Sequence, residues 1–375
     1  MSTITAPLLP VGGSSTPGLL PSPQPSPQPV DNRFASSRRK HAAIAVLSAF
    51  TAMLLFAGLA FHGYVAWVIA HPYVSPLTSN PMLAKGLEYT DVAFPSKSGK
   101  TTVHGWYIPA YEMNGPKPLR SAAATADMKN TQHAAATAAL SQAPSKRTVV
   151  FSHGYGANRE ETWVPMYELA GLLNRLHYNV LMFDYGYASK ADPSPATGGL
   201  EESKQLLAAV DYASSQGAEE LIVWGFSMGA GTALQAALQT DQIDAMILDS
   251  LFLPSPESLY SNIRQVVDLP RYPSLPLIEW MLPFWTGTTF NHIPAQQVLE
   301  TAYSIPTFII HGTEDAKAPV DTAKHIASGQ FNPLSREWIV QGGKHELLFQ
   351  AHPKEYIQRA ALFLSQVNAS RKSDV

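Results

Sequence analysis

A short motif in the second half of the chain, Gly225-Phe226-Ser227-Met228-Gly229, could carry nucleophilic chemistry. It follows an apolar run, 221–224, that predicts a buried strand, and precedes a small-residue run, 230–238, that predicts a helix. A serine in a sharp strand-to-helix turn projects its hydroxyl above the sheet, and flanking glycines allow close backbone approach. Ser227 is therefore the candidate nucleophile, and an ordinary turn is the alternative.

A serine hydroxyl becomes a good nucleophile only when a base removes its proton, and the base needs an orienting acid. His345 lies just past a predicted strand, 338–340, in a glycine-rich loop, and is the predicted base. His153 is an alternative base. His345 and Glu346 begin like the zinc-binding motif H-E-x-x-H, but Phe349 stands where the second histidine is needed, so we predict no metal.

The acid is expected after the serine in sequence, on a loop that follows a strand. Asp315 fits best because it comes just after the predicted strand 308–310. Asp249 and Glu314 are the rivals for this role. Asp184 precedes the serine, and we expect it to be structural.

The oxyanion of an acyl-transfer intermediate needs two preorganised N–H donors. The residue after the nucleophile supplies one, which here is Met228. The loop after the predicted strand 148–151 should supply the other, and Tyr155 is the best candidate. His153 and His311 each precede a glycine at a strand end, which suggests a shared supporting role.

These residues require a sheet that brings several strand ends together. From residue 148 onward strands alternate with helices, which predicts an α/β fold with a mostly parallel sheet covered on both faces. The expected strands are 148–151, 180–183, 221–224, 246–248, 308–310 and 338–340. The expected helices are 158–176, with Asn158 and Glu161 as a capping box, 200–215, 230–238, 320–327 and 353–364. A hairpin-like pair, 87–94 and 101–108, predicts an antiparallel edge.

Two insertions interrupt this order. Residues 111–147 are rich in Ala, Ser and Thr without a sustained apolar face, so we interpret them as a surface insertion. Residues 251–303 form a long interruption that carries several prolines and aromatic side chains. These aromatic residues could line an apolar acyl or aryl pocket, or could merely pack this segment onto the sheet.

The amino-terminal part has a different composition. Residues 1–41 are expected to be a disordered Pro- and Ser-rich tail, because they cannot bury enough apolar area to offset their ordering entropy. Residues 42–70 are apolar on all faces and exceed the roughly 20 residues that cross a bilayer as a helix. We predict an uncleaved transmembrane helix. A signal peptide cleaved after Ala70 is the alternative, although a signal core is usually shorter.

Basic residues precede this apolar run and none follows it closely, so the amino terminus is expected in the cytoplasm and the rest outside it, at the cell membrane. A linker, 71–85, then leads to the catalytic domain, 86–368, and a tail, 369–375. The net charge is −3 without a basic stripe, which gives no case for nucleic acid. The chain has no cysteine, so disulfides and thiolate catalysis are excluded. No particular oligomeric state is predicted.

Taken as a set, four segments resemble the α/β-hydrolases, and most closely their serine aminopeptidase and monoacylglycerol-lipase-like branch with a bacterial membrane anchor. They are Ser152-His153-Gly154-Tyr155-Gly156, Gly225-Phe226-Ser227-Met228-Gly229, Ile310-His311-Gly312-Thr313-Glu314-Asp315 and Gly343-Lys344-His345. The resemblance covers about 86–368. It implies a triad of Ser227, Asp315 and His345, a cap at 251–303, and no metal or organic cofactor. Many relatives have Asp-x-Arg-Gly-His-Gly where this chain has Asp184-Tyr185-Gly186-Tyr187-Ala188-Ser189, which could alter the pocket rim.

The sequence thus predicts a membrane-anchored serine hydrolase that cleaves a small-molecule carboxylic ester or related acyl substrate through an acyl-enzyme. The lipid bilayer is the second expected partner, bound by the amino-terminal helix. An aminopeptidase or amidase with the same triad is one alternative. A membrane-anchored binding protein that keeps the fold without turnover is the other.

Overall fold

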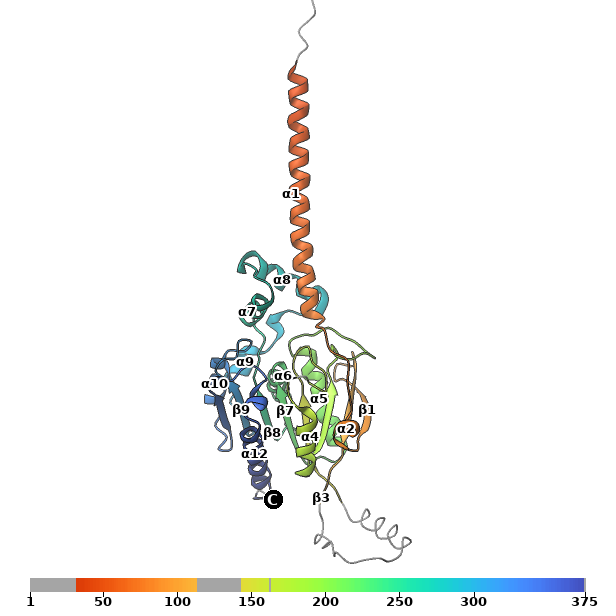
Figure 1. Cartoon of the computed structure of the whole chain (residues 1–375), viewed down its shortest axis with the longest axis vertical. Coiled ribbons are helices and arrows are strands. Elements are labelled where there is room, and N and C mark those ends of the chain that lie inside the picture. The colour runs from red at the N-terminus through yellow and green to blue at the C-terminus, as the bar shows by residue number, and fades with distance from the viewer. Residues whose placement is uncertain (1–31, 113–142, 162, 374–375) are drawn as a thin grey trace, which may run out of the picture. The chain divides into compact units, whose positions relative to one another are not determined.

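The computed structural model describes residues 32–112, 143–161 and 163–373, and its main feature is an eight-stranded sheet (Figure 1). The chain divides into two units, 1–57 and 58–375. Strands β5 to β10 run parallel, whereas β1 and β2 form an antiparallel edge. In spatial order the sheet contains β1 (Thr90–Pro95), β2 (Thr102–Ile108), β6 (Asn179–Asp184), β5 (Arg147–Ser152), β7 (Glu220–Phe226), β8 (Ala245–Asp249), β9 (Thr307–Gly312) and β10 (Arg336–Val340).

Helices cover both faces of this sheet. One face packs against α5 (Leu200–Ser215), α6 (Met228–Ala237) and α10 (Val320–Ser328). The other face packs against α4 (Met166–Arg175) and α12 (Pro353–Ser373). The predicted three-layer arrangement and its antiparallel edge are therefore confirmed.

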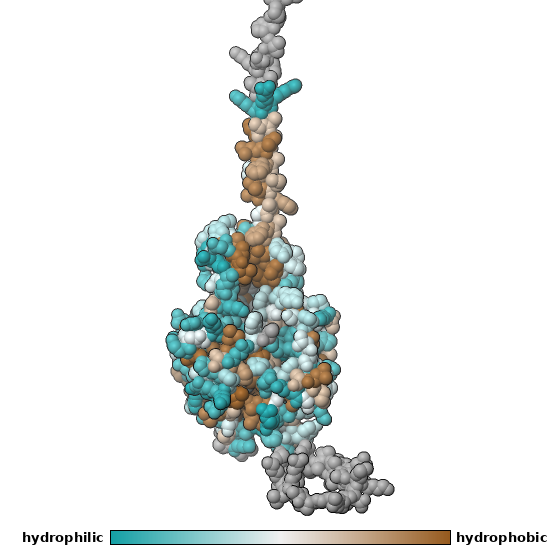
Figure 2. All heavy atoms as spheres, in the orientation of Figure 1, coloured by the Kyte–Doolittle hydropathy of each residue, from teal (hydrophilic) through white to brown (hydrophobic). Residues whose placement is uncertain are grey.

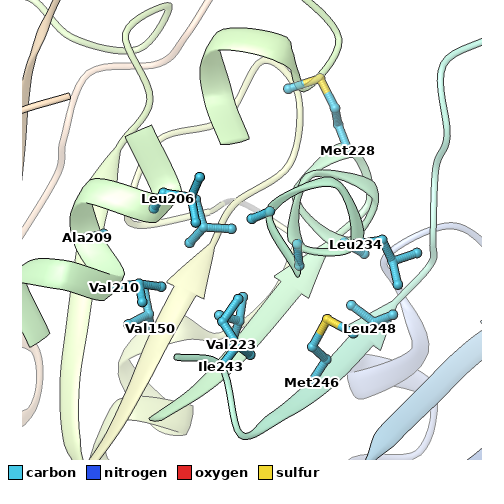
Figure 3. Packing of buried hydrophobic residues seen from close by; sticks show 14 of the residues in the cluster. Val150, Leu206, Ala209, Val210, Val223, Met228, Leu234, Ile243, Met246 and Leu248 are labelled. Atoms are coloured by element: carbon cyan, nitrogen blue, oxygen red, sulfur yellow. The ribbon is translucent and has the colours of Figure 1, made fainter. Parts of the chain in front are cut away.

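The strand next to the serine shows how the two cores are divided. In β7, Val223 faces α5 and α6, while Ile222 and Trp224 face α4 and α12, as the two-residue period of a strand requires. Figure 3 shows Val223 among buried side chains of α5, α6 and neighbouring strands. Trp224 is fully buried, and truncating such a side chain to alanine costs about 3–5 kcal/mol. This packing holds the end of β7 in place.

The 251–303 interruption is helical. It contains α7 (Pro256–Val266), α8 (Arg271–Thr286), the 3₁₀ turn η1 (Phe290–His292) and α9 (Ala295–Glu300). Two smaller helices, α2 (Pro81–Lys85) and α11 (Leu348–Ala351), complete the described helices. Part of the 111–147 insertion is a two-stranded pairing of β3 (Tyr111–Glu112) with β4 (Ala143–Pro144). The rest of that insertion, 113–142, lies outside the described residues.

The amino-terminal helix α1 (Asn32–Ala70) begins ten residues earlier than predicted, so 32–41 are helical and not part of an extended tail. Residues 1–31 lie outside the described residues. Apolar side chains surround much of α1 (Figure 2), and 37–70 are long and apolar enough to span a membrane. A signal sequence passes the same test. At the other end, α12 runs to Ser373, so the predicted carboxy-terminal tail is helical at its start.

The predicted helix start at Asn158 is wrong. Helix α4 begins at Met166, directly after Pro165, and the residues before it form a turn. Glu161 does not cap a helix, because its side chain accepts a hydrogen bond from the N–H of Gly154 across 2.9 Å. A proline lacks the N–H that an earlier helix start would need at that position.

The same turn binds the linker that follows α1. The carboxylate of Glu160 accepts hydrogen bonds of 2.6 Å from the N–H groups of Thr78 and Ser79. The side-chain amide of Asn158 donates to the carbonyl of Ser75 across 2.7 Å. The linker 71–85 is therefore attached to the loop after β5 through Ser75, Thr78 and Ser79.

Candidate active site

Ser227 lies in a strained turn between β7 and α6. Its backbone angles, φ 52° and ψ −120°, are rarely adopted by residues other than glycine. The turn is held because the Ser227 N–H donates to the carbonyl of Asp249 across 2.9 Å. A Cβ at Gly229 would overlap the carbonyl oxygen of Ser152, and one at Gly225 would lie 2.6 Å from the Cα of Ala230. Both glycines of the motif are thus required sterically.

The structure brings the predicted nucleophile, base and acid together. The hydroxyl of Ser227 lies 2.8 Å from Nε2 of His345. Nδ1 of His345 lies 2.6 Å from Oδ2 of Asp315. A carboxylate only accepts hydrogen bonds, so Nδ1 carries the ring proton and Nε2 is free to accept the serine proton.

Asp315 is fixed by the loop that follows β9. Its other carboxylate oxygen, Oδ1, accepts hydrogen bonds from the N–H groups of Lys317 and Ala318, at 2.9 and 2.8 Å. The side chain has no solvent exposure. His311 supports the same loop, because its Nε2 donates to the carbonyl of Ala318 across 3.0 Å. This contact with the Asp315 loop agrees with the supporting role expected of His311. Glu314, the weaker rival, is exposed on the same loop.

Asp249, the main rival acid, has different partners. Its carboxylate accepts hydrogen bonds from the hydroxyls of Tyr356, at 2.6 Å, and Ser250, at 2.9 Å. The Ser250 hydroxyl oxygen in turn accepts from the N–H of Glu346, at 2.8 Å, beside the candidate base. Burial raises the pKa of Asp249 to about 6. This residue braces the histidine loop from behind and does not contact the imidazole.

His153, the alternative base, is fully buried with both ring nitrogens engaged. Nε2 accepts a hydrogen bond from the N–H of Tyr185 across 3.0 Å, and Nδ1 lies 3.0 Å from the carbonyl of Gly154. Burial lowers the pKa of this histidine to about 4. It is therefore a neutral group that joins the ends of β5 and β6. Asp184, at the end of β6, binds the buried Arg159 at 2.7 Å, as its expected structural role requires.

Met228 and Tyr155, the predicted oxyanion donors, line one cavity with Ser227 and His345. Among the hydrogen bonds of the described residues, none uses the N–H of Met228 or of Tyr155. The N–H of Met228 is at the amino end of α6, where the helix dipole favours negative charge. These two groups are available to a ligand oxygen.

Two buried carboxyl groups behind the serine were not predicted. A Cβ at Gly154 would lie 2.5 Å from Oε1 of Glu346, 3.2 Å from Oε2 of Glu161 and 3.4 Å from Cβ of Ser227. Burial, and next the charge of Glu161, raise the pKa of Glu346 well above its usual value. Neighbouring like charges in a buried site favour a shared proton. Glu346 directly follows the candidate base, which was the only sequence signal for this pair.

No group of three or more His, Asp or Glu residues in the described part of the chain is arranged to hold a metal ion. The cavity beside the serine has a volume of about 680 Å³, within the range of small-molecule sites. Its lining is mainly apolar and includes the serine and the histidine. The arrangement can activate a hydroxyl beside a space for an apolar group.

Comparisons with known proteins agree with this architecture. Residues 147–274 match the family model for the alpha/beta hydrolase fold. The uncharacterised protein YfhR of Salmonella typhimurium is 24% identical over 284 residues, which cover 70% of this chain and 89% of that protein. The lysophosphatidylserine lipase ABHD12 of Danio rerio is 26% identical over 196 residues, which cover 48% of this chain and 47% of that protein.

Among solved structures, an esterase of Pyrococcus furiosus, Pf2001, superposes with a TM-score of 0.59 at 21% identity, covering 80% of this chain and 98% of the esterase. At this identity the likeness shows the fold. Together with the parallel sheet, the helices on both faces and the match to the family model, it shows that the chain has the α/β-hydrolase fold.

Proposed function

We propose that the chain is a membrane-anchored serine hydrolase that cleaves a carboxylic ester or related acyl substrate through an acyl-enzyme. The observation that carries this proposal is the continuous contact from Ser227 Oγ through the imidazole of His345 to Asp315, at 2.8 and 2.6 Å. These are the distances that general-base activation of a serine requires. The fold, and the names of the esterase and lipase above, support the same class of reaction.

In the first half of the reaction, Ser227 Oγ attacks the acyl carbon while its proton passes to Nε2 of His345. Asp315 holds the ring and stabilises the imidazolium that forms. The N–H groups of Met228 and Tyr155 hold the negative oxygen. The carbon–oxygen bond to the leaving alcohol then breaks, and the alcohol takes the proton from His345.

In the second half, the same histidine removes a proton from water, and the resulting attack on the acyl-enzyme releases the carboxylic acid and restores Ser227. The proton transfers in both halves use the contacts from Ser227 through His345 to Asp315. Amide cleavage by the same groups would give the aminopeptidase alternative. An ester is favoured because the cavity beside the serine is lined mainly by apolar side chains, and the acidic and basic residues in its lining are Lys317, His345 and Glu346.

Labelling with a fluorophosphonate probe tests the proposal. The wild-type chain should be labelled, and Ser227→Ala should not be. A wild-type protein that stays unlabelled would favour the non-catalytic binding alternative. Comparing p-nitrophenyl esters with aminoacyl anilides then separates an esterase from a peptidase, since preferential anilide cleavage would overturn the ester assignment.

The membrane placement is part of the same proposal. We infer that α1 anchors the chain in the cell membrane with its amino terminus in the cytoplasm and the catalytic domain outside, because Arg38, Arg39 and Lys40 precede the apolar run. Reporter fusions at the carboxy terminus test this topology. Activity of a reporter that works only in the cytoplasm would contradict it.

A further inference from the structure

The cavity beside the serine is formed partly by the amino-terminal helix. Its walls come from the end of α1, from the cap and from the catalytic loops. The residues contributed by α1 are Phe61, Tyr64, Val65, Val68 and Ile69. Their spacing places them on one face of the helix. The last turns of α1 are therefore one wall of the space into which Ser227 opens.

The same turns are also packed onto the cap. Ala66 is fully buried against Ile278, Met281 and Leu282 of α8. Gly63, which has no side chain, lets the two helices come close, since a Cβ there would be 3.5 Å from Sδ of Met281. This contact fixes the cavity-facing side of α1 relative to the serine.

The hydrocarbon layer should end where this wall begins. A helix crosses the hydrocarbon with about 20 residues. Counted from Ala42, this length ends near Phe61, the first α1 residue that lines the cavity. Aromatic residues follow directly in the sequence: Tyr64 stacks on Trp67 with ring centroids 6.0 Å apart. Tyrosine and tryptophan favour the boundary between lipid and water.

The cap continues this aromatic zone. His71 lies between the ring of Trp67, at 5.3 Å, and that of Trp285 on α8, at 6.3 Å. Trp280 and Phe284, one turn apart on α8, are 62% and 70% exposed. Figure 2 shows apolar side chains gathered on the cap beside the last turns of α1. Contiguous exposed apolar side chains of this kind mark an interaction surface.

We propose that this site takes an acyl lipid directly from the bilayer, with one acyl chain lying in the cavity along α1 and its ester at Ser227. The exposed face of α8 rests in the lipid interface and holds the cavity mouth there. The bilayer is the occupant of this face because the face adjoins the membrane-spanning helix. The inference rests on the proposed function, since Ser227 must form the acyl bond and release the lipid alcohol.

A variant in the wall tests the acyl site. Full-length protein is reconstituted in phosphatidylcholine vesicles that contain either palmitoyl-glycerol or palmitoyl-lysophosphatidylglycerol. Val65→Trp fills the cavity from α1 and should lower palmitoyl turnover about 10-fold or more, because rejection by a filled pocket is of this size. Turnover of soluble p-nitrophenyl acetate should fall by a smaller factor, because an acetyl group is much shorter than a palmitoyl chain. Leu59→Trp, on the same helix but outside the cavity lining, is the matched control and should change neither.

The relative rates of the two palmitoyl lipids identify the headgroup that the site accepts. Equal losses of palmitoyl and acetyl turnover in Val65→Trp, or no loss of either, would overturn the acyl site. A wild-type protein that hydrolyses the acetate and takes the fluorophosphonate label, but leaves both lipids intact, would overturn this inference while the proposed function stands. Failure of the label itself would overturn the proposed function.

A second variant tests the interface. Trp280→Ser combined with Phe284→Ser should raise the KM for vesicle-borne lipid about 10-fold without changing kcat or acetate turnover. Phe331→Ser, which removes another exposed aromatic ring outside the cap, is the control. If the double variant instead leaves the KM unchanged and alters the oligomeric state, the face of α8 binds protein and the membrane interface is refuted.

Discussion

The hydroxyl of Tyr155 donates a hydrogen bond of 2.7 Å to the carbonyl of Ile69, in the last turn of α1. The same residue contributes a proposed oxyanion donor through its backbone N–H. The carbonyl of the next residue, Ala70, accepts from the N–H of Ala196, also at 2.7 Å. The carboxyl end of the amino-terminal helix, whose carbonyls lack partners within the helix, is thus attached to the catalytic loops.

Removing the first of these contacts should slow the reaction without preventing it. Tyr155→Phe deletes one hydrogen bond worth about 1 kcal/mol, so kcat should fall about 5-fold as the loop gains freedom. Fluorophosphonate labelling should persist. Tyr73→Phe is the matched control, because it removes a hydroxyl from a ring that is 82% exposed and outside the cavity lining. Equal kcat values for the two variants would show that the Ile69 contact does not position the loop.

The two candidate acids are distinguished by the same substitution at each. Asp315→Asn should lower kcat by about 10⁴-fold, because the amide cannot hold the histidine tautomer. Asp249→Asn should keep kcat within about 10-fold but lower the free energy of unfolding by about 1–3 kcal/mol, since Tyr356 and Ser250 lose part of their acceptor. Steady-state kinetics and urea unfolding measure both effects. The reverse pattern would make Asp249 the catalytic acid.

Stability should depend on pH through Glu346. Its pKa is raised well above 4.5 in the folded chain, so folding favours the protonated form. That stabilisation is fully present below about pH 4.5 and is lost as pH rises through the folded-state pKa. Glu346→Gln should therefore lose less stability than wild type between acid and alkaline pH.

The thermal denaturation midpoint as a function of pH measures this difference. Glu337→Gln, at an exposed position on β10, serves as the control and should follow the wild-type curve. A Glu346→Gln curve parallel to wild type would show that the proton is not held at this residue.

The glycines of the serine turn should tolerate no side chain. Gly229→Ala places a methyl group against the backbone of Ser152, which cannot move without shifting β5, and we expect a loss of about 3 kcal/mol in stability together with the fluorophosphonate label. Gly171→Ala, inside α4 with only an ordinary contact to Arg175, should be neutral or slightly stabilising. Urea unfolding of both variants is the measurement, and a stable, labelled Gly229→Ala would contradict the steric argument.

Local sequence patterns predicted the strands and most helices, because the spacing of apolar residues along a segment reflects which of its side chains are buried. Helix 200–215 has the predicted bounds, and the strands differ by a few residues at their ends. The start of α4 was misread because Asn158 and Glu161 have the residue types of a capping box. In the folded chain the Glu161 carboxylate instead binds Gly154, a contact set by tertiary packing.

The candidate site also has a part that the sequence predicts and a part that it does not. Ser227, Asp315 and His345 could be named because each follows a strand that local pattern identifies, and a parallel sheet brings such ends to one edge. The proximity of Glu161 to Glu346 could not be predicted from the sequence, because it depends on how two distant turns pack beside Gly154. The side of α1 that lines the cavity could not be predicted either, because a helix that is apolar on all faces has no sequence pattern that marks one side.

The hydrogen bonds of Glu160 and Asn158 to the linker 71–85 shorten the freely moving chain between α1 and the catalytic domain. If α1 lies in a bilayer, as proposed, these bonds would limit how far the serine can move from the lipid surface. Encounters with a lipid would then be governed by lateral diffusion in two dimensions, where a confined reactant meets its partner at a high effective concentration. Turnover should accordingly follow the mole fraction of the lipid in the membrane, and dilution of the vesicles in buffer should leave it unchanged.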